Sequence, residues 1–465
     1  MDALMWISHA ERPLKPDELC HALAVERGSL DVNADNVPSI GTLLLCCQGL
    51  VVMDKEASTV RLIHFTLQEY LKAHVEFFGA AHATMAETCL SYLNSQQVKA
   101  LSASSSPDLP STPFLEYSSV YWGVHAKRGL SNRAELLVLA LKLFDDYNNQ
   151  IPTRILLEAQ EYYSPTIDST KLFLFRGLHY ASFFGIVEIV VGLMEVEGCD
   201  INQEDCIGNT PLGWAACNGH EGVVEILLGE DHISADKPDM DGQTPLCCAA
   251  QHGHEGVVKM LLRRDDINPN KPDIDGQTPL CCAAQSGHEG VVKMLLGRDD
   301  VDPDRPDNHG LTPLCCAAWN GHVGVVKVLL GRGDVDPNKP GWCGRTPLWF
   351  AAENGREGVV EILLGRDDIN PDKSDIDGQT PLCRAAQSGH EGVVKMLLRR
   401  DDVNPEKPDN CGLTPLWHAL LNGQVDVVEV ILDPGGTNPN KPGWMVWLEF
   451  SLVFTFFVVI LVLWW

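Results

Sequence analysis

The sequence predicts a mainly α-helical protein in which about eight similar helix pairs stack into a solenoid. The tripeptide Thr-Pro-Leu recurs with a constant spacing of 34 residues, and each copy contains two short segments with helical apolar spacing. A helix pair of this size cannot bury its apolar faces alone, so neighbouring copies must stack. The seven clear copies begin at Thr210, Thr244, Thr278, Thr312, Thr346, Thr380 and Thr414.

The copy that begins at Thr278 shows why each unit forms two helices. The hydroxyl of Thr278 can cap a helix, and Pro279 fits the first helical turn without loss of a hydrogen bond. Gly287 is expected to end this helix, and a second begins near His288. Residues 291–296 supply the broad apolar surface that a helix buried on both sides requires.

An eighth, degenerate copy precedes the others. The segment that begins at Arg176, "RGLHYASFFGIVEIVVGLM", keeps the Leu, Ala, Gly and Val-Val spacing but lacks Thr-Pro. The first unit of a solenoid commonly departs from the repeat pattern, because it caps the end of the stack. The repeats are therefore expected to cover residues 173–443.

The repeat resembles a known family. Its pattern Asp-x-x-Gly-x-Thr-Pro-Leu, followed by Ala-Ala, Gly-His and Val-Val-x-x-Leu-Leu, is similar to the ankyrin repeat, although Cys-Cys replaces the usual His-x and the period is one residue longer. The resemblance implies a solenoid that binds a protein partner and is not an enzyme. It implies no cofactor and no bound metal.

Residues 1–78 have a different organisation. Helices are expected at Asp2 to Ala10, Pro16 to Glu26 and Val37 to Cys47, followed by a hairpin of Leu50 to Met53 and Val60 to His64. Helices followed by a two-stranded wing make a winged helix. The phrases "LMWISHAERPLKPDELCHAL" and "RLIHFTLQEYL" are similar to the winged-helix segment that follows the NACHT module in fungal signalling NTPases with ankyrin arrays.

That second resemblance implies a sensor role in fungal signalling, non-self recognition or programmed cell death. The chain has no Gly-Lys dipeptide and therefore no phosphate-binding P-loop. The resemblance then implies that the chain is the sensor part of a NACHT-type protein, or a regulatory remnant of one whose NTPase module is missing from the gene model. His64 is at the position where relatives can contact nucleotide, but without a P-loop it is expected only to pack.

Two further segments complete the chain. Residues 79–172 are expected to form a helical coupler. Residues 444–465 are expected to form a transmembrane helix, because Met445 to Trp465 are apolar except for Glu449. One interpretation is the anchor of a tail-anchored membrane adaptor; the other is translation of an intron after a mis-assigned splice site.

The net charge and the amino-terminal sequence limit which partners and which cellular location we expect. A formal net charge of -28 repels phosphate backbones, and the candidate recognition helix "VPSIGTLLLCCQGL" contains no Lys or Arg, so nucleic acid is excluded as a partner. The amino terminus lacks a secretory signal. The protein is therefore expected in the cytoplasm, with anchoring at a membrane through Met445 to Trp465 as a further expectation.

The two motifs that suggest chemistry are better explained as scaffold. His-Glu pairs such as His288-Glu289 begin like a zinc-protease signature, but valine stands at the second ligand position. Adjacent cysteines such as Cys281 and Cys282 lack the spacing of a zinc site. We expect the second cysteine of each pair in the core and the first semi-exposed.

The residues that depart from the repeat pattern are the candidate partner-binding site. Trp and Arg are favoured anchors of interfaces, and several departures fall on finger tips or first helices. The alternative is drift, with Trp349 and Phe350 replacing a Cys pair in the core. Arg384 must reach solvent or pair with an acid, because its equivalents look buried. The candidates are Trp319, Trp342, Arg345, Trp349, Phe350, Arg356, Arg384, Trp417 and His418.

Overall fold

The fold is that of a computed structural model of the chain. The structure describes residues 1–27, 34–101, 112–129, 134–145, 151–160, 172 and 174–432. Within these residues the protein is mainly helical, as predicted, and a single two-stranded sheet is present. The chain divides into two compact units. The N-terminal unit comprises Met1–Ala249 and Lys259–Ile267, and the C-terminal unit comprises Ala250–Val258 and the chain from Asn268 onward.

The N-terminal unit begins with short helices and a hairpin, as predicted. Strand β1 (Val51–Asp54) pairs antiparallel with β2 (Thr59–Leu62), with Val51 opposite Leu62. The backbone N–H of Val60 also donates to the carbonyl of Leu14, which ties the hairpin to the segment before the second helix. The helical elements of this part are α1 (Asp2–His9), α2 (Pro16–Ala24), η1 (Ala34–Asn36), α3 (Ile40–Cys46), α4 (Phe65–Ala73) and η2 (Val75–Phe77).

The helices that follow pack against this head. Helix α5 packs along α7, and α1 contacts α5. The core between them is aromatic: the ring of Trp6 meets those of Phe114 and Tyr117 edge to face, with centroids 5.4 and 5.9 Å apart. These helices are α5 (Ala81–Leu93), α6 (Gln96–Lys99), α7 (Leu115–Gly129), α8 (Ala134–Asp145) and α9 (Ile151–Ala159).

The repeats form helix pairs whose boundaries follow the predicted caps. The hydroxyl of Thr278 accepts the N–H of Cys281, and Pro279 is the first helical residue. Gly287 ends the helix with φ +83°, and a side chain there would also lie within 3 Å of the His322 ring, so only glycine fits. The pairs are α10 (Gly177–Phe184) and α11 (Val187–Met194), α12 (Pro211–Cys217) and α13 (Glu221–Leu228), α14 (Pro245–Gln251) and α15 (Glu255–Leu261), α16 (Pro279–Ser286) and α17 (Glu289–Leu296), α18 (Pro313–Asn320) and α19 (Val323–Leu330), α20 (Pro347–Glu353) and α21 (Glu357–Leu364), α22 (Pro381–Ser388) and α23 (Glu391–Leu398), α24 (Pro415–Leu421) and α25 (Val425–Leu432).

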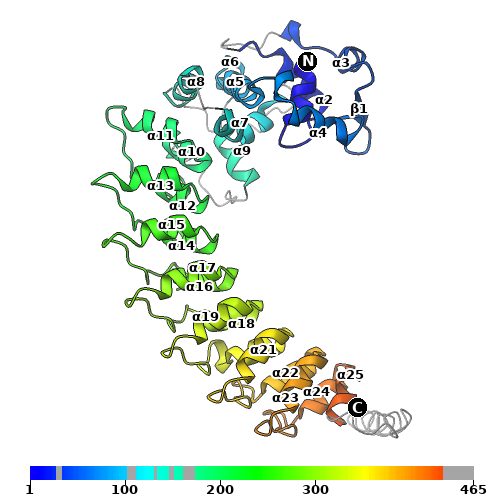
Figure 1. Cartoon of the computed structure of the whole chain (residues 1–465), viewed down its shortest axis with the longest axis vertical. Helices are drawn as coiled ribbons and strands as arrows, with labels where there is room; N and C mark the ends of the chain where they lie inside the picture. The colour runs from blue at the N-terminus through cyan, green and yellow to red at the C-terminus, as the bar shows by residue number, and fades with distance from the viewer. Residues whose placement is uncertain are drawn as a thin grey trace. The chain divides into compact units, whose positions relative to one another are not determined.

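Consecutive pairs of the C-terminal unit stack in register (Figure 1). First helices contact first helices, as α16 does α18, and second helices contact second helices, as α17 does α19. Small residues on the first helix, such as Ala283, and branched residues on the second, such as Val292, are fully buried between neighbours. The predicted solenoid core is therefore confirmed.

Polar side chains also join the loops, here called fingers, that connect one pair to the next. Asn338 accepts the N–H of Asn370 and donates its amide to the carbonyl of Asp368. Lys373 donates to the carbonyl of Asn338. The bond from the backbone N–H and the bond from the lysine recur at the 34-residue interval, at Asp304 and at Asp372, so they hold the fingers at a fixed spacing.

The predicted transmembrane helix at 444–465 lies outside the described residues. None of the helices within the described ranges combines the length and the hydrophobicity needed to cross a bilayer.

Candidate functional site

The finger before α20 is built differently from its neighbours. In the preceding repeat, Asp307 closes the finger by accepting the N–H groups of His309 and Leu311. Gly341 stands at the equivalent position before α20 and has no side chain for this task. The finger instead forms the 3₁₀ turn η4 (Trp342–Gly344). Trp342, at the tip of this finger, is 50% exposed.

A row of aromatic rings connects this repeat to the one before it. Trp319, at the end of α18, stacks on Phe350 of α20 with ring centroids 5.1 Å apart and planes 18° apart. Phe350 in turn meets Trp349 edge to face at 5.4 Å. Trp349 and Phe350 are fully buried, whereas Trp319 is 37% exposed. Trp349 and Phe350 therefore fill the core where other repeats have a cysteine pair. Trp319 is the ring of this row that is partly exposed to solvent.

Two arginines lie over the buried indole. The guanidinium carbon of Arg345 is 4.2 Å from the centroid of the Trp349 ring and 5.0 Å from that of Trp342. Arg384 lies 4.9 Å from the Trp349 ring and forms an ion pair with Glu353. The expectation that Arg384 reaches solvent or pairs with an acid is thus met by Glu353.

Four buried polar atoms of this cluster have no hydrogen-bond partner among the described residues. They are Trp349 Nε1, Arg345 Nε, Arg384 Nε and Asp375 Oδ2. Arg345 Nε and Asp375 Oδ2 are 3.8 Å apart, which is an ion pair but too long for a hydrogen bond. By contrast, Trp214 in the N-terminal unit donates its Nε1 hydrogen to Asp205 at 2.7 Å. The four atoms belong to two adjacent repeats, and a buried donor left unsatisfied costs about 1–3 kcal/mol.

Apolar side chains also occupy the tip of the finger after Trp342 and the tip two repeats before it, whereas Asn308 occupies the tip between. Ile376, on the following finger, is 63% exposed, and Ile274 is 61% exposed. The backbone N–H of Ile376 donates to the carbonyl of Cys343, which fixes the spacing of the two adjacent tips. Ile274 and Ile376 are not among the residues predicted from the sequence, although their positions, two and one repeat lengths from Trp342, could have indicated them.

Arg356 has a scaffold role. Its Nε–H donates to the carbonyl of Trp319 at 3.0 Å. In neighbouring repeats a histidine makes the same link: His322 contacts the carbonyl of Gln285 at 2.9 Å and His390 that of Glu353 at 2.9 Å. The prediction that this histidine is a scaffold residue is therefore confirmed, and Arg356 replaces it.

Trp417 and His418 lie on α24. Trp417 is half-buried. His418 is buried and contacts Asp409 through Nε2 at 2.9 Å. Trp214 and Asp205 form the equivalent contact in an earlier repeat, because His418 occupies the repeat position of Trp214 and Asp409 that of Asp205. His418 is thus accounted for by the packing of its own repeat.

The expectation of semi-exposed thiols is wrong. Cys281, the first cysteine of its pair, is fully buried, and Cys282 is also buried. The Cys281 thiol contacts the backbone carbonyl of Arg305 on the next finger, which covers it. Burial raises the pKa of Cys281 to about 11, so the thiol is protonated and unreactive.

His64 also differs from the expectation that it packs. Its side chain is exposed, and Nδ1 accepts the backbone N–H of Thr66, which caps the start of α4. The residue therefore has a local structural role.

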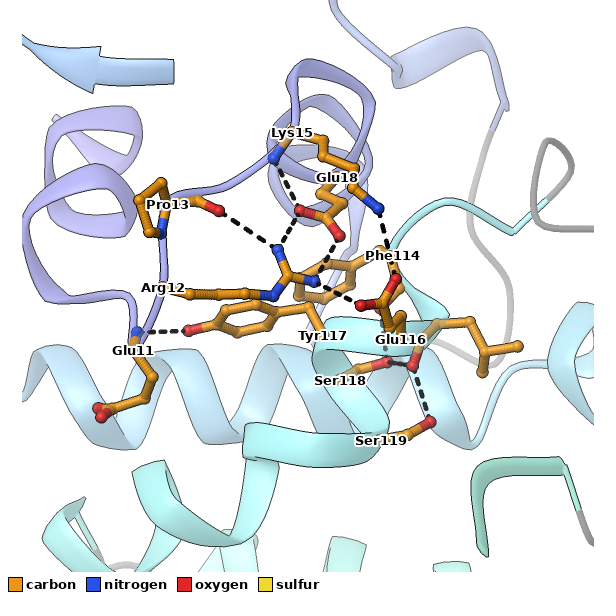
Figure 2. Close-up of polar contacts among 11 residues, drawn as sticks. Glu11, Arg12, Pro13, Lys15, Glu18, Phe114, Glu116, Tyr117, Ser118 and Ser119 are labelled. Atoms are coloured by element: carbon orange, nitrogen blue, oxygen red, sulfur yellow. Dashed lines mark hydrogen bonds and ion pairs between the residues drawn. The ribbon is translucent and has the colours of Figure 1, made fainter. Parts of the chain in front are cut away.

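A second polar cluster, which sequence analysis missed, holds the head onto the coupler within the N-terminal unit. Figure 2 shows Arg12 reaching over the Tyr117 ring to Glu18 and Glu116. Arg12 forms two parallel hydrogen bonds with Glu18 at 2.8 and 2.7 Å, and Glu18 is almost completely buried. Lys15 adds an ion pair to Glu116. The segment between α1 and α2 is thus fixed to α7.

Comparison with known protein families agrees with this architecture. A model of ankyrin repeats in three copies matches residues 178–273, 266–341, 308–375, 332–408 and 348–442, together more than half of the chain. The chain belongs to the ankyrin-repeat family. Residues 2–80 of this ankyrin-repeat protein match the winged helix domain of GPI inositol-deacylase, which agrees with the predicted winged-helix head. The comparison with curated proteins found no match.

Proposed function

We propose that this ankyrin-repeat protein is a non-enzymatic scaffold that binds a protein partner through the finger tips and first helices of its C-terminal unit. The observation that carries the proposal is the pair of exposed apolar side chains on successive fingers, Trp342 and Ile376. Trp319 extends the same kind of surface onto α18. Monomeric surfaces seldom gather large apolar side chains without a binding role.

The Trp342 ring is held in place before any partner arrives. Arg345 lies against it, and Arg345 is itself fixed by the Trp349 ring and by the carboxylate of Asp375. A pre-organised aromatic anchor loses little conformational freedom on binding, which is what hot-spot residues require. In this proposal Trp349 and Phe350 act from the core by positioning Trp319 and Arg345.

The winged-helix match supports a narrower role. Winged helices next to ankyrin arrays are the arrangement that resembles NACHT-type signalling proteins, so the scaffold acts as a sensor in the cytoplasm. The arginine cluster that joins the head to α7 supports a head and coupler that move as one piece.

A tail-anchored adaptor is the second candidate, and the apolar sequence from Met445 to Trp465 favours it. The anchored protein stays in the pellet after alkaline carbonate extraction, whereas a chain that ends at Pro442 is released. Release of the full chain by carbonate contradicts the anchor. A spliced transcript that continues with another Thr-Pro-Leu unit contradicts it as well.

The partner-binding proposal is tested with substitutions that the repeat itself tolerates. Asn308 occupies the position of Trp342 one repeat earlier, and Asn410 occupies that of Ile376 one repeat later. Trp342→Asn and Ile376→Asn therefore remove the apolar tips with little effect on the fingers. Met240→Asn is the matched control, because Met240 is an equally exposed tip, at 61%, in the N-terminal unit.

The three proteins and the wild type are compared by proximity labelling in their own cells, and the labelled partner is then titrated with purified protein. We expect Trp342→Asn to weaken binding by about 30-fold, the effect of a hot spot near 2 kcal/mol. Met240→Asn should bind as the wild type does. Unchanged affinity in the Trp342 and Ile376 variants would falsify the proposed surface.

A further inference from the structure

Three residues that are far apart in the sequence meet in the N-terminal unit. Glu11 follows α1, His82 lies in the first turn of α5, and His125 lies on α7. One ligand atom from each of these side chains lies within 4.8 Å of the other two. The Nδ1 atoms of His82 and His125 are 2.8 Å apart, and the two rings stack with centroids 5.1 Å apart. Two imidazoles and a carboxylate therefore converge on one point.

The outer contacts of the cluster orient its ligands. The far nitrogen of His125, Nε2, lies 2.8 Å from the Tyr117 hydroxyl, which also accepts the backbone N–H of Glu11. His125 is fully buried, so its ring cannot turn away from His82. A partner on the second ring nitrogen is the usual outer-shell arrangement of a metal-bound histidine. Glu11 pairs with Arg128, and a carboxylate has a second oxygen with which to bind a cation.

Two of the three residues also line a pocket. Its volume is about 620 Å³, and Glu11 and His82 form part of its wall together with His9, Lys72 and Arg128. An ion bound by Glu11 and His82 is therefore accessible from solvent. The same pocket provides room for a water molecule as a further ligand.

We propose that Glu11, His82 and His125 form a binding site for a divalent transition metal of the zinc class. Two histidines and one carboxylate are a ligand set that such metals take, with an open fourth position. Zinc bonds of about 2.0 Å in tetrahedral geometry separate two nitrogen ligands by roughly 3.3 Å, so the rings must part by only about 0.5 Å. The metal takes the place of the single proton that the two facing nitrogens otherwise share.

The surrounding charges set an expectation for affinity. Lys72 and Arg128 line the same pocket and repel a cation. Glu11 offsets part of this repulsion, because it contributes a carboxylate to the cluster itself. The site is therefore expected to bind less tightly than a structural zinc site with four ligands.

Cobalt(II) is the probe, because its visible spectrum separates this site from the cysteines of the chain. The full-length protein is titrated with Co²⁺, and we expect visible d–d bands without the near-ultraviolet charge-transfer band that thiolate ligands produce. Glu11→Gln and His82→Gln are the test variants, and both residues lie at the edge of the cluster, so the fold is retained and is checked by circular dichroism. His309→Gln is the control, because His309 is an exposed finger residue.

We expect at least tenfold weaker Co²⁺ binding in Glu11→Gln and His82→Gln, and wild-type binding in His309→Gln. Tyr117→Phe should bind about tenfold more weakly while the d–d bands keep their shape, since it removes an outer contact and no ligand. Absence of the bands in the wild type overturns the proposal. So does a thiolate band, or a d–d spectrum that is unchanged in His82→Gln.

Discussion

The ring of Trp319 stacks on that of Phe350, with centroids 5.1 Å apart and planes 18° apart. Phe350 is fully buried, and Trp319 is the point where the aromatic row reaches solvent. One repeat earlier, the position of Phe350 is occupied by Cys316. A residue inside one repeat thus determines what the neighbouring repeat presents at its surface.

Replacement of Phe350 by cysteine tests this dependence. Phe350→Cys removes a buried ring and leaves a cavity beside Trp319, so we expect a loss of about 2–4 kcal/mol in the free energy of unfolding. Urea unfolding followed by circular dichroism measures it. Cys316→Ala, in the ordinary repeat, should cost about 1 kcal/mol. Equal losses in the two variants contradict a special role for Phe350.

The second prediction concerns the buried indole N–H of Trp349. Trp349→Phe removes a buried donor that has no partner among the described residues, so relief of this penalty offsets part of the lost packing. Trp214→Phe instead leaves the Asp205 carboxylate without its 2.7 Å hydrogen bond. We expect Trp214→Phe to be more destabilising by about 1–3 kcal/mol, measured by urea unfolding. The reverse order would show that Trp349 Nε1 is satisfied.

At Asp304 and Asp372 the fingers lack a hydrogen bond that Asn338 donates at the equivalent position, and we expect the resulting loss of stability to depend on pH. Asn338, at the equivalent position, donates its amide to the carbonyl of Asp368, but a carboxylate cannot donate. Asp304 Oδ1 and Asp372 Oδ1 accordingly have no hydrogen-bond partner among the described residues. The double variant Asp304→Asn, Asp372→Asn should be more stable at pH 7 by about 1 kcal/mol for each site.

The sign of the pH effect follows from the shifted pKa values. Burial raises the pKa of both Asp304 and Asp372 above the ordinary value of about 3.9. Their contribution to stability is therefore largest in acid and is lost as the pH rises through the raised pKa. The advantage of the asparagine variant should shrink between pH 7 and pH 4, measured as the difference in Tm. Asn338→Asp, the control, should lose stability at pH 7.

Thiol reactivity distinguishes the buried cysteines from the exposed ones. Cys46 and Cys411 are exposed, whereas both members of the cysteine pairs in the repeats are buried, namely Cys247 and Cys248, Cys281 and Cys282, and Cys315 and Cys316. Burial raises the pKa of Cys315 to about 11, as it does for Cys281. Native protein treated with iodoacetamide should be alkylated at Cys46 and Cys411 first, as identified by mass spectrometry of peptides. Early alkylation of Cys281 or Cys315 would mean that the finger does not cover the thiol.

The repeat architecture could be predicted in detail because its signals are local. Thr278, Pro279 and Gly287 act within their own helix, through a side-chain cap, a restricted φ and a left-handed φ. The position of each helix therefore followed from the sequence. The burial of Cys281, the first cysteine of its pair, did not follow from the sequence, because its thiol is covered by Arg305, a residue of the next finger.

The candidate site was predicted in part. Comparison between repeats identified Trp342, Arg345 and Arg384, since departures from a near-identical pattern are visible in one sequence. It left open whether Trp349 and Phe350 lie at the binding surface or replace a cysteine pair in the core. Burial depends on what covers each ring: Arg345 of the same repeat and Arg384 of the next repeat lie over Trp349.

By itself, then, the sequence determined the family, the repeat period and the ends of the helices, because caps, turns and apolar spacing act over a few residues. Only the tertiary structure decided which side chains share a surface or a pocket. Glu11, His82 and His125 lie on different helices and loops, and no spacing in the chain connects them. They converge because α5 and α7 pack side by side while Arg12 fixes the segment before α2 onto α7, and such packing depends on the whole unit.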